Sequence, residues 1–207
     1  MKVLMINGSP NQFGSTHTAL KYVADYLAEE DISSEIIWLG DKPIQDCVGC
    51  DACKKLGKCI FDDDIINEIL EKSKLAHGFV FGSPVYYASP SGRIISALNR
   101  LFYAGSQHFA FKPASSIVTA RRAGTTSSLD VLNKYFLINQ MPIVSSTYWN
   151  MIFGRTPDEL KSDLEGIQTM KFVGKNMAWM LKCINIANSR GENHPQIENK
   201  IHTNFIR

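Results

Sequence analysis

The sequence predicts an α/β domain in which a five-stranded parallel sheet of order 2-1-3-4-5 carries helices on both faces. Short apolar runs, typical of buried strands, alternate with segments of helical period through most of the 207 residues. The chain contains no internal repeat and no low-complexity stretch. A chain of this length closes one sizeable core, so we expect one domain over residues 1–187 and a C-terminal tail over residues 188–207.

The first expected unit is a strand at residues 2–6, a loop rich in hydroxyl side chains and a helix that begins near Ser15. Residues 35–39 form the second expected strand. The polar segment that follows holds four cysteines and has no clear period, so we expect a loop there. The first helix is predicted because apolar side chains recur on one face, at Leu20, Val23, Ala24, Leu27 and Ala28.

Acidic residues 62–64 come before the next apolar stretch, where they can cap a helix and favour its positive end. A third strand is expected at residues 78–81. After Ser83 and Pro84 a further helix is predicted, followed by a fourth strand centred on residues 117–119. The apolar face of that helix consists of Ile94, Ile95, Leu98, Leu101 and Phe102.

The last third of the chain is predicted to hold two more helices and the fifth strand. One helix is expected from Ser127 to about Leu137, and the strand is expected at residues 143–144. Thr156 precedes a proline and, three residues on, a glutamate. This is capping-box spacing with proline at the first helical position, so we expect one long helix from Thr156 towards Cys183.

The composition excludes several classes of protein. Hydrophobic residues make up 44% and charged residues 20% of the chain, as in folded globular proteins. The net charge of +2 is spread along the chain, so we expect no nucleic-acid partner. The apolar run at residues 1–6 is too short for a signal-peptide core or a membrane span, so we expect no membrane association. Four of five cysteines lie within residues 47–59, which favours metal or redox chemistry in a reducing cytoplasm over a secreted disulfide framework.

The loop after the first strand is a candidate phosphate site. Its hydroxyl side chains crowd the beginning of a helix, where free backbone N–H groups attract an anion. The loop lacks the lysine of a nucleoside-triphosphate loop and the spaced glycines of a dinucleotide fingerprint, so a phosphate monoester such as that of FMN fits better. The alternative is that Ser15 or Thr16 only caps the helix. The candidate phosphate contacts are Ser9, Asn11, Ser15, Thr16 and Thr18.

Three motifs in this order and spacing point to one family: Gly8-Ser9-Pro10, the cysteine segment ending in Asp62-Asp63, and Gly82-Ser83-Pro84-Val85-Tyr86-Tyr87. Together they resemble the NADPH-dependent FMN reductase and iron-sulfur flavoprotein superfamily, and the likeness covers about residues 1–185. The resemblance implies a flavodoxin-like three-layer sandwich, FMN as cofactor, NAD(P)H as co-substrate and a homodimer or homotetramer.

By this resemblance, residues 83–87 lie beside the isoalloxazine ring, and residues 119–126 occupy the place of the third flavin loop. Arg121 or Arg122 could stabilise a negatively charged reduced flavin or bind the phosphate of the nicotinamide donor. The alternatives are two core tyrosines at 86 and 87 and two solvated arginines. The candidate flavin contacts in these loops are Ser83, Pro84, Val85, Tyr86, Tyr87, Thr119, Arg121 and Gly124.

The candidate metal ligands are Cys47, Cys50, Cys53 and Cys59, which lie near enough in sequence for one tetrahedral set. They resemble the compact motif of iron-sulfur flavoproteins, which implies a [4Fe-4S] cluster. Their spacing departs from the common bacterial ferredoxin run, so zinc and free thiols remain alternatives. We expect Cys183 to be a small buried residue of the last helix.

These features favour an FMN-dependent oxidoreductase that passes electrons from NAD(P)H to a small molecule, such as a quinone or flavin, or to a redox protein. The flavin carries the chemistry, so no acid–base pair is nominated. The alternatives are an FMN electron-transfer protein without nicotinamide turnover and a cysteine-based redox or metal sensor. The Met-rich last helix and four further aromatic residues form either core or a subunit interface over the flavin. These aromatic residues are Tyr103, Phe109, Phe111 and Trp149.

Overall fold

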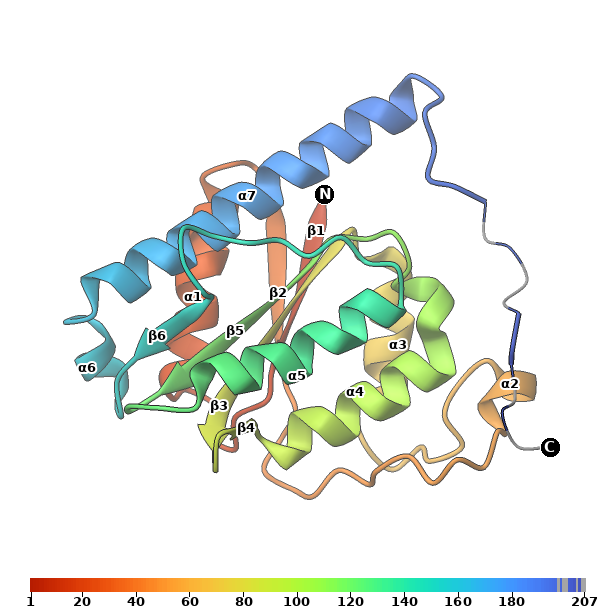
Figure 1. Cartoon of the computed structure of the whole chain (residues 1–207), viewed down its shortest axis with the longest axis horizontal. Coiled ribbons are helices and arrows are strands. Elements are labelled where there is room, and N and C mark those ends of the chain that lie inside the picture. The colour runs from red at the N-terminus through yellow and green to blue at the C-terminus, as the bar shows by residue number, and fades with distance from the viewer. Residues whose placement is uncertain (197, 199–200, 204, 206–207) are drawn as a thin grey trace.

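A parallel sheet with strand order β2-β1-β3-β5-β6 forms the centre of the molecule (Figure 1). The structure is a computed structural model that describes residues 1–196, 198, 201–203 and 205. The order is that of the predicted doubly wound sheet, once the short β4, which pairs antiparallel with the end of β3, is set aside. The strands are β1 (Lys2–Asn7), β2 (Ser33–Trp38), β3 (Gly78–Tyr86), β4 (Ser89–Pro90), β5 (Ala114–Ala120) and β6 (Met151–Phe153).

Helices cover both faces of this sheet, as predicted. Alternate residues of a strand point to opposite faces, so Val3 and Met5 belong to one core cluster and Leu4 and Ile6 to the other. The first cluster is closed by α1 (Ser15–Ala28) and α7 (Leu164–Ser189). The second is closed by α3 (Ile66–Leu75), α4 (Gly92–Gly105) and α5 (Thr125–Ile138).

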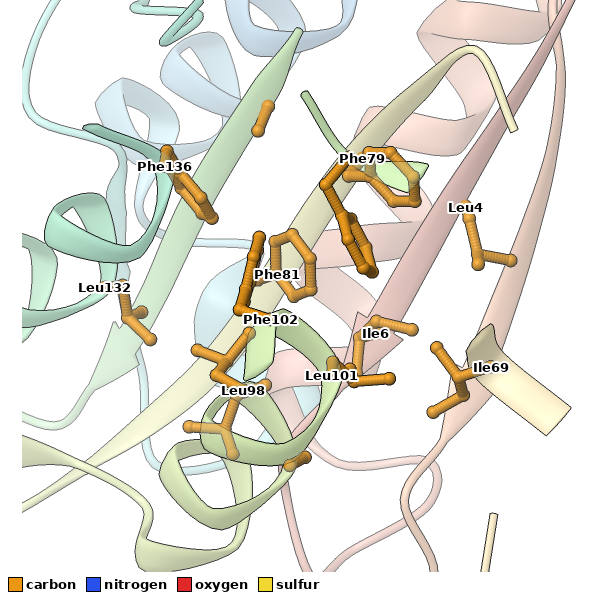
Figure 2. Packing of buried hydrophobic residues seen from close by; sticks show 14 of the residues in the cluster. Leu4, Ile6, Ile69, Phe79, Phe81, Leu98, Leu101, Phe102, Leu132 and Phe136 are labelled. Carbon is orange, nitrogen blue, oxygen red and sulfur yellow. The ribbon is translucent and has the colours of Figure 1, made fainter. Parts of the chain in front are cut away.

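Aromatic rings fill the core between the sheet and α4 and α5. Figure 2 shows Phe79 and Phe81 of β3 facing Phe102 of α4 and Phe136 of α5. The rings of Phe81 and Phe136 have centroids 5.3 Å apart in a tilted arrangement, a geometry that aromatic pairs favour. Phe109 is fully buried in the same cluster, so it is a core residue and is not available to a subunit interface.

The edge strand differs from the prediction. We expected the fifth strand at Ile143 and Val144, but Ile143 forms only an isolated parallel bridge with Ala114. The strand itself is β6, which pairs with the last three residues of β5. Residues 145–149 leave the ladder between these two contacts. The Asn150 side chain donates to Ser115 Oγ (2.9 Å) and to the Val144 carbonyl (3.3 Å), while the Asn150 carbonyl accepts from the Val118 amide (2.9 Å).

The predicted last helix is divided in two. Thr156 caps only the short α6 (Pro157–Leu160), accepting a hydrogen bond from the Glu159 amide. Asp163 then starts α7, because its carboxylate accepts bonds from the amides of Gly166 (2.9 Å) and Phe153 (2.7 Å). The helix α7 extends to Ser189, and Cys183 is exposed on it, so the expectation of a buried cysteine was wrong.

Smaller differences concern the loops and the tail. The third strand continues through the predicted flavin motif to Tyr86, and the cysteine segment contains a short helix, α2 (Cys53–Leu56). A 3₁₀ turn at Ser106–His108 directly follows α4. Helix α5 begins two residues before the expected Ser127. The expected tail of residues 188–207 lies partly outside the described residues; within it, the ring of His194 stacks on Phe111 with centroids 4.4 Å apart. No helix in the described part of the chain is both long and apolar enough to cross a membrane.

Candidate functional site

The loops after β1, β3 and β5 meet at the carboxyl edge of the sheet, at the bottom of Figure 1. Gly8 joins the first two: its amide donates to the Gly82 carbonyl (2.9 Å), and its own carbonyl accepts from Ser91 Oγ (2.7 Å). A Cβ atom at Gly8 would lie 2.8 Å from the side chain of Ile94. The close approach of β1 to α4 therefore requires glycine at this position.

The first turn of α1 offers donors that no protein group uses. Its N-cap residue is Gly14, which has no side chain to cap the helix. Within the described residues, the amides of Ser15, Thr16 and His17 have no protein acceptor. The buried Ser15 hydroxyl is, among those same residues, the one buried side-chain polar atom that lacks a hydrogen-bond partner. Buried polar atoms are normally satisfied, so this site fits a bound anion such as a phosphate.

The other hydroxyls of this loop hold its shape. Ser9 is buried, and its Oγ accepts from the Asn11 amide (3.1 Å). Thr16 is also buried, and its Oγ1 lies 2.9 Å from Thr119 Oγ1, which links the first and third loops. Thr18 Oγ1 donates back to the Gly14 carbonyl (3.3 Å). Among the described residues, Ser15 is the one of the four predicted hydroxyl contacts that makes no hydrogen bond, while Asn11 lies exposed at the rim.

Sequence reasoning missed two side chains that build this loop. Asn7, at the end of β1, is fully buried; its Oδ1 accepts from the Ser9 amide (3.0 Å) and its Nδ2 donates to the Gln12 carbonyl (3.0 Å). Trp38, at the end of β2, donates from Nε1 to the Ser9 carbonyl (2.8 Å). The available signal was an asparagine directly before Gly8, a residue type that often bonds to the backbone two residues on.

The second loop is a hairpin between β3 and β4. Ser83 is fully buried, and its Oγ accepts from the Ser91 amide (2.9 Å), so this side chain fixes the path of the chain. The turn residues Tyr87 and Ala88 have φ of +49° and +58°, a left-handed conformation that costs non-glycine residues about 1 kcal/mol or more each. Tyr86 and Tyr87 are 48% and 104% exposed, which contradicts the alternative of two core tyrosines.

The third loop packs against this hairpin. Gly124 has φ of +89°, and a Cβ atom there would lie 2.7 Å from Ala88 Cα. The Ser127 hydroxyl donates to the Ala88 carbonyl (2.6 Å). Arg121 and Arg122 are exposed directly after β5. The structure thus brings the hairpin and the third loop together and leaves exposed tyrosines and two cations at the same edge as the free donors of α1.

The four clustered cysteines form a second site beside the last turns of α4. All four line one small cavity, together with Arg100 and Tyr103 of that helix. Burial raises the pKa of the Cys53 thiol. The other three cysteines raise it further, because neighbouring thiolates repel one another. The cysteine segment, which includes α2, lies at the right of Figure 1.

The donor set of this second site consists of four thiols that line one cavity. Among the residues described, no three His, Cys, Asp or Glu side chains converge closely enough to hold one metal ion. Zinc needs its thiolates about 2.3 Å from one point. In a [4Fe-4S] cluster each of four thiolates binds a different iron, so the sulfur atoms stand further apart around a larger group. The four cysteines line a common cavity, but its volume is only about 20 Å³, so the described part of the chain shows no formed cluster site.

Sequence reasoning also missed Arg100, the largest fully buried side chain. Its Nε donates to Cys59 Sγ (3.2 Å), and its other nitrogens form an ion pair with Asp64. Burial opposes its charge, but hydrogen bonds with Asp64 and Cys59 outweigh this and raise the pKa of Arg100 above its ordinary value. The guanidinium is therefore a permanent buried cation beside one of the four sulfurs.

A sheet of this order, with an anion site after β1 and exposed aromatic residues after β3, defines a flavodoxin-like protein. Comparison with known families gives the particular assignment. The family model described as NADPH-dependent FMN reductase matches residues 1–155. The chain belongs to this family, and it is a flavoprotein oxidoreductase of the NAD(P)H-dependent FMN reductase type.

Relatives and solved structures agree with this assignment. An iron-sulfur flavoprotein of Methanocaldococcus jannaschii is 33% identical over 192 residues, which cover 89% of this chain and 99% of the relative. The crystal structure of RosB, with a bound 8-demethyl-8-formylriboflavin-5'-phosphate intermediate, aligns with a TM-score of 0.66 at 16% identity, covering 100% of this chain and 94% of RosB. A flavodoxin from the domain Archaea aligns with a TM-score of 0.58 at 12% identity, covering 88% and 99% of the two chains. These structures have the same fold as this chain.

Proposed function

We propose that this oxidoreductase passes electrons from NAD(P)H through bound FMN to an acceptor and holds a [4Fe-4S] cluster as a second redox centre. The observation that carries the flavin part is the free Ser15 hydroxyl beside three free amides, directly after β1. A phosphate at this position would satisfy all four donors. The acceptor is a small molecule, such as a quinone or flavin, or a redox protein.

The residues present fit FMN in the following way. The phosphate binds to Ser15 Oγ and the first amides of α1, where the helix dipole favours negative charge. The ring lies against the hairpin at Tyr86 and Tyr87, with Arg121 near its polar edge as a candidate partner for negative charge. FMN, when bound, supplies the hydride and single-electron chemistry, and the chain supplies orientation and a partly dry edge. No protein nucleophile or acid–base pair is required.

Two observations support the cluster. All four cysteines of the motif line one cavity. A relative that covers nearly the whole chain at 33% identity carries the name iron-sulfur flavoprotein. The cluster would be held by Cys47, Cys50, Cys53 and Cys59, and it would give electrons a one-electron exit from the flavin.

The test is an anaerobic preparation of the full chain analysed for flavin, iron and acid-labile sulfide, followed by NAD(P)H oxidation at steady state. We expect flavin absorbance, iron and sulfide near four per chain, and turnover of the nicotinamide. Folded protein that takes up no FMN would reject the flavin part, and flavin without iron would reject the cluster. Bound flavin without nicotinamide oxidation would instead support an FMN electron-transfer protein.

A cysteine-based sensor is the second candidate function, and it must be distinguished from the reductase. In a cysteine-based sensor the thiols carry the function and the flavin is incidental. Replacement of Cys50 by serine should then abolish the response to metal or oxidant. Reductase turnover that persists in Cys50→Ser shows that the flavin site works without the intact motif, and this outcome counts against the sensor.

We also propose a homodimer or homotetramer in the cytoplasm, without nucleic-acid or membrane partners. Exposed aromatic side chains in the loop after β1, on α4 and just before β6 support self-association: Phe13 is 70%, Tyr103 55% and Trp149 57% exposed. Light scattering on the purified chain tests this proposal. A monomer at micromolar concentration would contradict it.

A further inference from the structure

Arg100 binds both ends of the cysteine segment to α4. Its side chain is 1% exposed, yet all five of its N–H donors have acceptors. Before the cysteines, its Nη1 donates to the Gln45 carbonyl (3.2 Å). After them, its Nη2 donates to the Phe61 carbonyl (3.0 Å) and to Asp64 Oδ1 (3.1 Å). Its Nη1 also donates to Asp64 Oδ2. The fifth acceptor is Cys59 Sγ, 3.2 Å from Nε.

The orientation of the guanidinium determines which charged group, Arg100 or Asp64, lies next to the Cys59 sulfur. The Asp64 carboxylate binds both terminal nitrogens, on the side away from Nε. The pair therefore carries little net charge, but its positive end touches Cys59 while its negative end points away. An ionised donor in a buried site forms a strong hydrogen bond, because the local dielectric constant is low.

We propose that Arg100 is a positioning residue that presents Cys59 to the cluster and raises the reduction potential of that cluster. This inference rests on the proposed cluster. Reduction by one electron, delivered from the flavin, makes a four-thiolate cluster more negative. A hydrogen bond to a ligand sulfur favours the more negative state, and hydrogen bonds and local charge are known determinants of cluster potentials. Removal of the Arg100 bond should therefore lower the potential, whereas removal of the Asp64 charge should raise it.

The chain offers a matched control in Arg93, two turns earlier on the same face of α4. Arg93 donates to the carbonyls of Gly40, Asp41 and Lys42. It thus fixes the beginning of the same segment but bonds to no cysteine in the part of the chain that is described. A change that merely loosens the segment would affect both arginines alike.

The experiment is a redox titration, followed by electron paramagnetic resonance, of the anaerobically purified holoprotein and of Arg100→Lys, Asp64→Asn and Arg93→Lys. Lysine keeps the charge but cannot reach Cys59 and Asp64 together. For Arg100→Lys we expect the reduction equilibrium to fall about tenfold, which is about 59 mV for a one-electron couple. Asp64→Asn should shift it in the opposite direction, and Arg93→Lys should leave it unchanged.

Iron and sulfide analysis of the same samples separates the outcomes. A wild-type protein without iron and sulfide would overturn the proposed cluster itself. Iron and sulfide near four per chain with an unchanged potential in Arg100→Lys would overturn only the role of Arg100. If Arg100→Lys fails to retain the cluster, the sign of the Asp64→Asn shift decides: a positive shift supports the proposal, and no shift or a negative one overturns it.

Discussion

The Oγ1 atoms of Thr16 and Thr119 lie 2.9 Å apart, although the two residues are 103 positions apart in the sequence. This bond ties the beginning of α1 to the end of β5. The Thr16 hydroxyl is thus bonded inside the protein, whereas the neighbouring Ser15 hydroxyl makes no hydrogen bond among the described residues. The two neighbouring residues therefore have different roles, and substitution can separate them.

Replacement of Ser15 by alanine should weaken FMN binding without destabilising the protein free of flavin. A hydrogen bond to a charged group contributes about 1.5 to 3 kcal/mol, so the dissociation constant should rise at least tenfold. The free protein should be as stable as before or slightly more so, because an unsatisfied buried oxygen is removed. Fluorescence titration with FMN and thermal unfolding of the apoprotein measure the two effects. Thr18→Ala is the control, and equal affinity in Ser15→Ala and wild type would contradict the assignment.

Gly124→Ala should destabilise the protein and disturb the flavin loops together. The new Cβ would lie 2.7 Å from Ala88 Cα at a φ of +89°, so the expected loss is about 1 to 3 kcal/mol. Gly92→Ala is a matched control, because a Cβ atom at Gly92 meets no atom within 4 Å. Urea unfolding of both variants checks the difference. Equal stabilities would show that the hairpin moves freely to accept the added methyl group.

Cys59→Ser should remove the cluster while leaving the flavin in place. Cys59 is the buried member of the four and the one bonded to Arg100. Among the described residues its hydrogen bonds are to Asn67 and Arg100 and not to the loop after β1, so FMN content should stay at the wild-type level. Iron analysis and flavin absorbance measure both quantities in one sample. Cys183→Ser, on the exposed face of α7, should change neither, and iron retained in Cys59→Ser would remove this residue from the ligand set.

The ion pairs of Glu35 should make stability depend on pH in the acid range. Hydrogen bonds from Lys2 and Lys72 lower the pKa of Glu35 below its ordinary value. The contribution is complete above the ordinary glutamate pKa of about 4.3 and is lost as the pH falls through the lower value of the folded state. Glu35→Gln should therefore be less stable than wild type at pH 7, by less than about 1 kcal/mol.

The difference between Glu35→Gln and wild type should vanish near pH 2, which urea midpoints over this range can measure. Glu71→Gln, which removes an exposed pair with Lys74, serves as the comparison and should have a smaller effect at pH 7. A gap between Glu35→Gln and wild type that widens on acidification would show that the sign has been misassigned.

Sequence reasoning identified the parallel sheet and placed its three candidate loops at one edge because hydrophobic period and strand order are properties of long segments. It misplaced the edge strand, since β6 has only three residues and the neighbouring contact at Ile143 is a single bridge. The side chains that stabilise that edge, such as Asn150, act between residues far apart in sequence. The hydrophobic period of the sequence contains no information about such bonds.

Arg100 was missed for a related reason. It follows Leu98 and precedes Leu101 on a helix whose period indicates an apolar face, and nothing local distinguishes a buried arginine there from a solvated one. Its acceptors come from Gln45, Phe61 and Asp64, on a segment with no regular pattern. Only the folded chain brings these groups together, so the structure was needed to identify Arg100 and its partners as part of the cysteine site.

Helix α4 sets both the distance and the relative rotation between the two candidate sites. Ser91, at its beginning, bonds to Gly8 of the flavin loop, and Arg100, two and a half turns later, bonds to Cys59. Each residue added to an α-helix rotates everything beyond it by about 100°. An insertion of one residue between these two positions would swing the guanidinium off its sulfur while the flavin end stayed in register, whereas the irregular cysteine segment can change length between its anchors. A one-residue change in length is therefore tolerated less well in α4 than in the irregular parts of the cysteine segment.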